Sequence, residues 1–324
     1  MSATLDRPHR TPPEVRGTDG SPVRPESIAT RHAANPADAV DAASRARVAR
    51  GAGQRRRLPS IVVAIALAYA LVLLIAVLSP ALLGAGDATA ASPERALEAP
   101  SAAHWFGTDQ LGRDVYSRVV VGTKWSLGIA LSAMVIGVVG GTAIGLLAGL
   151  ARGLFDEILS RFLDLLSSFP GVLLALLIAV LWDRGPLSIA VAVGVSSIPK
   201  FGRIIRSRTL QVAGSDYVTH AVLFGHSRVR NVFRHVLPNV IGSIGLVAAM
   251  DIGTAILAVS GLSFLQMGPQ PPTPEWGVMV AEGRNVLRIA TWPSLFPGGA
   301  IVLAVVAFVV LGHHIQARFE GRLR

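Results

Sequence analysis

Three long stretches of this chain carry no charged side chain, and they constrain its fold more than any other feature. Residues 58–86 and 289–317 each contain 29 residues without Asp, Glu, Lys or Arg, and residues 125–151 contain 27. A helix needs about 20 mostly apolar residues to cross a bilayer. Only helices and closed barrels satisfy their backbone hydrogen bonds inside lipid. The lengths of these stretches therefore predict an all-α membrane protein.

The composition argues against an ordinary soluble enzyme. Of the 324 residues, 51% are hydrophobic and 15% are charged, whereas an average soluble domain is about 25% charged. The chain contains no Cys, which excludes disulfides, thiolate metal sites and a Cys nucleophile. The apolar pattern predicts six membrane-spanning helices, near residues 60–83, 121–150, 159–182, 186–206, 236–264 and 293–316.

Basic residues near the ends of the predicted spans indicate the orientation of the chain. If the N-terminus is cytoplasmic, the inner segments hold 17 Lys or Arg residues and the outer segments hold six. Cytoplasmic loops of membrane proteins are enriched in Lys and Arg, so both termini are predicted to be cytoplasmic. The loops at 84–120 and 265–291 then lie outside, and the loop at 207–235 lies inside.

The N-terminal segment differs from the rest of the chain. Residues 1–57 contain eleven Arg and six acidic residues and no apolar run, so they are predicted to form a disordered cytoplasmic tail. A nucleic-acid-binding arm is the weaker alternative for the basic cluster at 55–57, because the apolar run starts at the next residue. The predicted organisation is the tail at 1–57, a first transmembrane helix at 58–84, an extracytoplasmic segment at 85–120 and a five-helix core at 121–320.

A stripe of glycines marks the second predicted span. The stripe consists of Gly137, Gly141, Gly145 and Gly149, which are four residues apart. The same spacing continues to Gly153. Small residues on one stripe let two helices approach closely in lipid. The stripe therefore predicts a tight helix–helix contact, and it indicates no particular function.

Asp251 is the one acidic residue well inside a predicted span. An ionisable residue at membrane depth is a functional candidate, because its burial in lipid is costly. It would line a hydrophilic pathway or pair with a cation. The alternative is that it caps backbone groups or faces a partner subunit.

No motif in the chain predicts catalysis or a metal site. The adjacent His313 and His314 point about 100° apart on a helix, and the other histidines show no HExxH pattern. The sequence has neither a GxxxxGK[ST] phosphate-binding loop nor a GxSxG nucleophile motif. A charged group at the start of the third span is predicted to form ion pairs at the membrane interface: Asp156, Glu157, Arg161 and Asp164.

The outer loop at 269–277 contains four prolines, among them Pro271, Pro272 and Pro274. Proline fixes the backbone angle φ and favours an extended, stiff path. The loop is predicted either to be a rigid connector or to brace the outer mouth of the bundle. Trp276 is predicted to lie at the membrane–water interface, where Trp is enriched.

The inner loop carries the pattern that identifies a family. Thr219-His220-Ala221, Gly225 and Leu237-Pro238 keep the spacing of the cytoplasmic signature of bacterial ABC-importer permeases, which is EAA, three residues, Gly, nine residues, then IxLP. The Glu and Ile of that signature are replaced here. Basic residues in the same loop would alternatively meet anionic lipid headgroups.

Two outer stretches resemble one subfamily, the C-type permeases of dipeptide, oligopeptide and nickel systems. Residues 104–118 read HWFGTDQLGRDVYSR, and LSFL at 262–265 is followed by QPPTPEWG at 270–277. The chain departs from that pattern at Val259, where relatives often carry Glu.

The resemblance implies a type I ABC-importer permease in the bacterial inner membrane, forming half of a pore with a homologous B-type permease. Two ATPase domains would bind ATP and Mg²⁺ below it, and a substrate-binding protein would dock on the outside. This chain would hold no cofactor. Coupling helices at 214–234 would fit one ATPase and transmit its closure. The residues implied in coupling are Thr219, His220, Ala221, Gly225, Leu237 and Pro238.

The substrate implied by the resemblance is a dipeptide or oligopeptide, with nickel chelates, glutathione and haem as alternatives. Two other classes of protein fit the sequence less well. An intramembrane enzyme would need a nucleophile–base or metal pair at depth. A channel or secondary transporter would not need the cytoplasmic signature, and the spans are not expected to hold charge pairs for ion coupling.

Overall fold

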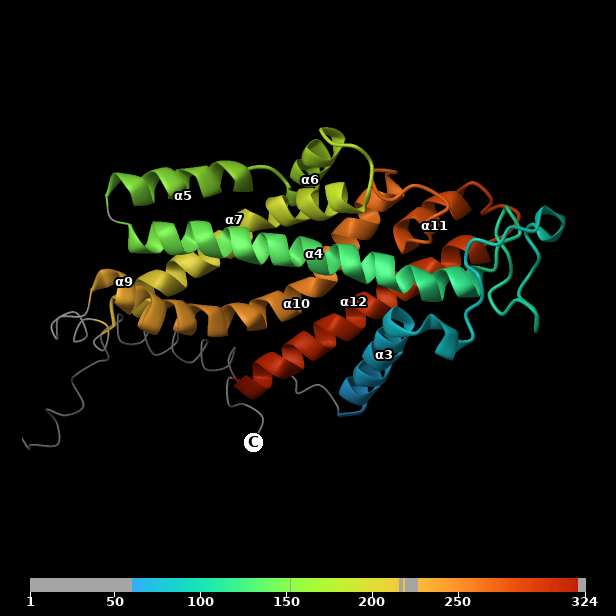
Figure 1. Cartoon of the computed structure of the whole chain (residues 1–324), viewed down its shortest axis with the longest axis horizontal. Coiled ribbons are helices and arrows are strands. Elements are labelled where there is room, and N and C mark those ends of the chain that lie inside the picture. The colour runs from blue at the N-terminus through green and yellow to red at the C-terminus, as the bar shows by residue number, and fades with distance from the viewer. Residues whose placement is uncertain (1–59, 152, 216–217, 219–226, 320–324) are drawn as a thin grey trace, which may run out of the picture. The chain divides into compact units, whose positions relative to one another are not determined.

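The computed structural model describes residues 60–151, 153–215, 218 and 227–319. Within these ranges the chain is a bundle of helices, which confirms the all-α prediction (Figure 1). The long helices are α3 Ser60–Leu78, α4 Val115–Leu150, α5 Leu154–Ser167, α6 Gly171–Val180, α7 Pro186–Ala213, α10 Leu237–Phe264 and α12 Trp292–Phe319. The predicted tail at 1–57 lies outside the described residues.

Shorter elements connect the long helices. Two 3₁₀ turns, Pro80–Leu83 and Pro93–Arg95, lie in the segment between α3 and α4. The helix α9 Arg228–Asn231 and a π-helical turn, Val232–Val236, lead into α10. The nine-residue helix α11 Trp276–Arg284 lies between α10 and α12, in the loop that the prolines predicted to be a stiff connector.

Five of the described helices are long and apolar enough to cross a membrane, and a sixth span is present if α5 and α6 count as one. The two are bent by 89° relative to each other, so the prediction of a continuous helix at 159–182 is wrong. Pro170 lies at the bend and precedes the first residue of α6. Proline has no backbone N–H and disfavours a helical conformation in the residue before it, so the helix ends there.

Two helices extend beyond their predicted bounds. The helix α4 begins at Val115 rather than near residue 121, because the Asp114 side chain caps it by accepting a hydrogen bond of 2.7 Å from the Ser117 N–H. The helix α7 continues through Pro199 to Ala213, past the predicted end at 206. Arg208 of the expected inner loop at 207–235 therefore lies on a continuous helix.

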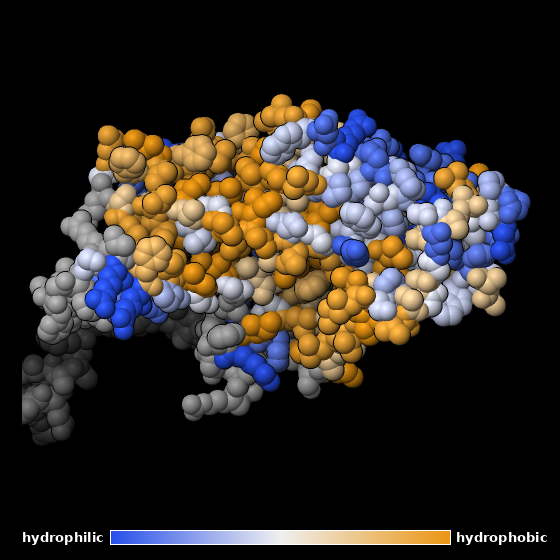
Figure 2. Space-filling view, viewed as in Figure 1, coloured by the Kyte–Doolittle hydropathy of each residue, from blue (hydrophilic) through white to orange (hydrophobic). Residues whose placement is uncertain are grey.

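The core of the bundle forms where α4, α7, α10 and α12 pack together. The helices α4 and α7 lie side by side along most of their length, and α3 packs on α12 (Figure 1). The visible face is apolar over the middle of the helices, and hydrophilic residues gather toward both ends (Figure 2). Large apolar side chains are exposed on α3, α5, α6 and α12. This distribution matches a bundle surrounded by lipid at its middle.

Candidate functional site

The segment between α7 and α10 is where the sequence predicts contact with an ATPase. The helix α10 begins at Leu237 and has Pro238 in its first turn, where the missing N–H of proline costs nothing. Val218 is buried, with 6% of its surface exposed. The other residues of the predicted signature lie outside the described part of the chain: Thr219, His220, Ala221 and Gly225.

Ion pairs join the C-terminal half of α7 to α5. The Arg206 guanidinium donates to both carboxylate oxygens of Asp156, at 2.7 and 2.8 Å. An Arg203 nitrogen lies 3.1 Å from an oxygen of Asp164. One longer pair, at 3.7 Å, stays within α5. The acids of α5 thus pair mainly with α7, rather than within the cluster predicted from the sequence.

The glycine stripe lies at the contact between α4 and α7. A Cβ atom on Gly141 would lie 2.5 Å from the Cβ of Phe201, and one on Gly145 would lie 2.5 Å from the carbonyl oxygen of Gly202. Gly137 and Gly149 meet α7 in the same way, one turn beyond at each end. Gly153 has no heavy atom within 4 Å of its position for a Cβ, so the stripe ends at Gly149.

The outer loop packs into the bundle. Pro271 and Pro272 are exposed, whereas Pro274 is buried. Trp276 is fully buried at 0% exposure, and its indole N–H donates to the Val119 carbonyl at 2.9 Å. The prediction that Trp276 lies at the membrane–water interface is therefore wrong. Its ring anchors α11 against α4.

Glu275 is a buried polar residue that the sequence pattern did not single out. It caps α11 by accepting a hydrogen bond of 3.0 Å from the Val278 N–H, and it accepts another of 2.9 Å from the Ser126 hydroxyl. Burial raises the pKa of the Glu275 carboxyl above its usual value, and these hydrogen bonds oppose that shift. Glu275 could have been identified from the sequence as an acidic residue directly before a helix-forming stretch.

A buried charge cluster joins the outer stretch at 104–118 to helix α11. Arg113 lies 2.6 Å from Asp109 and 3.3 Å from Glu282, and Arg118 lies 2.9 Å from Glu282. The two arginines are 2% and 1% exposed. Because two cations face two anions, the cluster is formally neutral, and it fixes the segment before α4 to α11.

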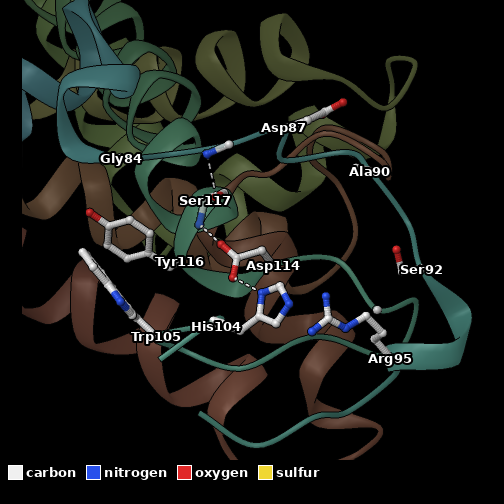
Figure 3. Close-up of a pocket in the computed structure, with 13 residues that line it drawn as sticks. Gly84, Asp87, Ala90, Ser92, Arg95, His104, Trp105, Asp114, Tyr116 and Ser117 are labelled. Carbon is white, nitrogen blue, oxygen red and sulfur yellow. Dashed lines mark hydrogen bonds and ion pairs between the residues drawn. The ribbon is translucent and has the colours of Figure 1, made fainter. Parts of the chain in front are cut away.

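A cavity of about 480 Å³ opens in the segment between α3 and α4, next to this cluster. Figure 3 shows Trp105 and Tyr116 on one side of it and Arg95 on the other. Between them His104 Nδ1 lies 2.9 Å from an oxygen of Asp114, the residue that caps α4. The cavity thus offers aromatic faces and charges of both signs.

Asp251 on α10 is paired with Lys200 on α7. The structure therefore places a cation beside the one acid that the sequence finds inside a span. Pairing with a cation was one of the roles predicted for Asp251, but its partner was not, because the two residues lie 51 positions apart and their contact is not visible in a local pattern. Among the described residues, no three His, Asp or Glu side chains are grouped so that they could hold a metal ion.

Comparisons with known proteins agree with these features. Residues 141–324 match the family model described as the inner membrane component of binding-protein-dependent transport systems. The glutathione transport system permease protein GsiD of Pectobacterium atrosepticum is 40% identical over 231 residues, which cover 71% of this chain and 77% of the relative. The dipeptide transport system permease protein DppC of Alkalihalophilus pseudofirmus is 34% identical over 252 residues, covering 78% of this chain and 83% of the relative.

Solved structures share the fold. A structure described as an inward-facing conformation of the MetNI methionine ABC transporter aligns with a TM-score of 0.52 at 15% identity, covering 64% of this chain and 97% of that chain. A second, described as an amino acid ABC transporter with histidines, aligns with a TM-score of 0.50 at 15% identity, covering 62% and 94%.

Proposed function

Because this chain belongs to the family of inner membrane components of binding-protein-dependent transport systems, we propose that the substrate it helps to import is a short peptide, with dipeptides and glutathione as the first candidates. The chain is a non-catalytic, multi-pass permease subunit of an ABC importer. The observation that carries the substrate class is the match, over more than two thirds of the chain, to permeases named for glutathione and for dipeptides.

The permease works in this proposal with partners that supply energy and specificity. Two ATPase domains bind ATP and Mg²⁺ and carry out hydrolysis, and a homologous B-type permease completes the pore. A substrate-binding protein docks at the end of the bundle that contains α11 and the cavity. There the neutral charge cluster holds α11 in place and supports a rigid surface. Lipid surrounds the apolar middle of the bundle.

The coupling to ATP hydrolysis runs, in the same proposal, through the segment at 214–234. Thr219, His220, Ala221 and Gly225 carry the signature that resembles the one in ABC-importer permeases, and they are proposed to contact the ATPase. Leu237 and Pro238 start α10 directly after this segment, so a push on the segment is transmitted along α10 into the bundle. Alternating access then follows from movement of packed helices as rigid bodies.

Uptake measurements test the substrate class. We expect a strain lacking this chain to lose uptake of a radiolabelled dipeptide or of labelled glutathione, and to regain it when the chain is restored. Uptake of a nickel chelate or of haem is measured beside them. Dependence of one of these on the chain, with normal peptide and glutathione uptake in the deletion strain, would contradict the proposal.

Reporter fusions test the orientation. The excess of Lys and Arg in the inner segments supports a cytoplasmic location for both termini. We expect alkaline phosphatase, which is active only outside the cytoplasm, to be active when fused at Glu98 or Glu282 and inactive when fused at Ser227. Activity at Ser227 together with inactivity at Glu98 would show that the orientation is reversed.

A further inference from the structure

The pair formed by Lys200 and Asp251 lies at the middle of the bundle. Lys200 is halfway along the 28 residues of α7, and Asp251 is halfway along the 28 residues of α10. With a rise of about 1.5 Å per residue, each lies roughly 20 Å from either end of its helix. On α7 the pair lies where the charge-free stretch at 185–199 meets the basic C-terminal half, and on α10 Asp251 lies four residues into the apolar span Val247–Phe264.

The two partners differ in exposure. The Lys200 side chain is 52% exposed, whereas the Asp251 side chain is 9% exposed. The positive charge of the pair is therefore accessible at the surface of the bundle, and the negative charge is buried. Arg203, one turn further along α7, is also 52% exposed, but its partner Asp164 is 61% exposed and cancels its charge at the surface. Lys200 is thus the accessible charge at this depth whose counter-ion is buried.

The charged side chain of Lys200 is unfavourable in contact with lipid. Charged groups at membrane depth face a bundle interior or a water-filled cavity, because lipid cannot solvate them. Thr254, one turn beyond Asp251 on α10, is exposed as well. By contrast, the exposed face of α12 is apolar near the middle of that helix, with Val302, Leu303 and Val306 each more than half exposed. Because Asp251 lies inside an apolar span, the side of the bundle that carries this pair is the one suited to a water-filled path.

We propose that the Lys200 ammonium binds the terminal carboxylate of a peptide as it crosses the membrane, and that Asp251 is a positioning residue that holds the ammonium in place. An ammonium has three N–H donors, and one of them is used by Asp251. The other two are free to donate charge-assisted hydrogen bonds to a carboxylate. This inference rests on the proposed peptide substrate.

The first arm of the test measures access to water and needs no substrate. Because the chain has no Cys, Lys200→Cys/Asp251→Asn introduces a single thiol into it and leaves no unpaired buried acid. We expect membrane-impermeant, charged methanethiosulfonate reagents to label this thiol in the assembled complex. The matched control is Val306→Cys, because Val306 is halfway along α12 and is 53% exposed. It should stay unlabelled, and equal labelling of both, or of neither, would overturn the inference.

The second arm tests the carboxylate. Against Asp251→Asn alone, we expect Lys200→Cys/Asp251→Asn to raise the KM for a free-acid dipeptide about tenfold, because a charge-assisted hydrogen bond is lost. The KM for the same peptide with an amidated C-terminus should not change. Aminoethyl methanethiosulfonate, which adds an ammonium to the thiol, should restore free-acid uptake, and the sulfonatoethyl reagent should not.

The outcomes separate this inference from its alternatives. Equal losses for the free acid and the amide, with loss of complex, would show instead that the pair belongs to the interface with the partner permease. If the wild type imports neither peptide, the proposed substrate class fails and the carboxylate ligand fails with it. The labelling arm would still report whether residue 200 borders water.

Discussion

The Gly141→Leu variant should reach the membrane without assembling into a stable complex. A Cβ at this position would lie 2.5 Å from the Cβ of Phe201 and 2.9 Å from the backbone nitrogen of Gly202, so α4 and α7 must separate. Overpacking of a close contact costs about 1–3 kcal/mol, and a contact with backbone leaves little room to relax. Co-purification of the ATPase and the partner permease with the tagged variant measures the effect.

The matched control for this variant is Gly128→Leu. Gly128 lies on the same helix, but no heavy atom lies within 4 Å of the position that its Cβ would take. We expect this variant to assemble normally, since leucine is tolerated on an exposed face of a membrane helix. Normal assembly of Gly141→Leu as well would show that the contact between α4 and α7 does not hold the complex together.

The Gly225→Asp variant should abolish transport while leaving the protein in the membrane. Gly225 is the glycine of the cytoplasmic signature, so a charged side chain there is expected to block docking of the ATPase. We expect uptake to fall to the level of the deletion strain. Immunoblots of the membrane fraction establish that the abundance of the variant is unchanged.

A charge reversal in the same segment is the control for Gly225→Asp. Arg230 is exposed and lies in α9. Ion pairs of exposed residues contribute about 0–1 kcal/mol, so Arg230→Glu should reduce uptake only mildly. An equal loss in both variants would mean that the charge of the segment, rather than the absence of a side chain at position 225, controls transport.

Composition predicts the membrane-spanning helices because each long span is apolar over its own length. The break at Pro170 and the cap at Asp114 are local signals too, and they explain why two predicted helix boundaries were wrong. The place of Trp276 could not be predicted, because an aromatic ring suits a core as well as an interface.

Contacts between distant parts of the chain mark the limit of prediction from the sequence. Asp251 stands out alone in an apolar span, but nothing local indicates that Lys200 faces it from another helix. The cluster that joins Arg113 and Arg118 to Glu282 likewise depends on α11 folding back onto the start of α4. Helix α11 was not predicted from the sequence, because the prolines directly before it indicated an extended connector.

ATP hydrolysis by the reconstituted complex tests the central claim most directly. Proteoliposomes would contain this chain, its partner permease and the two ATPase domains, and hydrolysis would be measured with and without peptide-loaded binding protein. We predict that the loaded binding protein stimulates hydrolysis in the wild-type complex, and that Gly225→Asp abolishes the stimulation while the basal rate persists. Equal stimulation in both complexes, with peptide uptake intact in the variant, would contradict coupling through this chain.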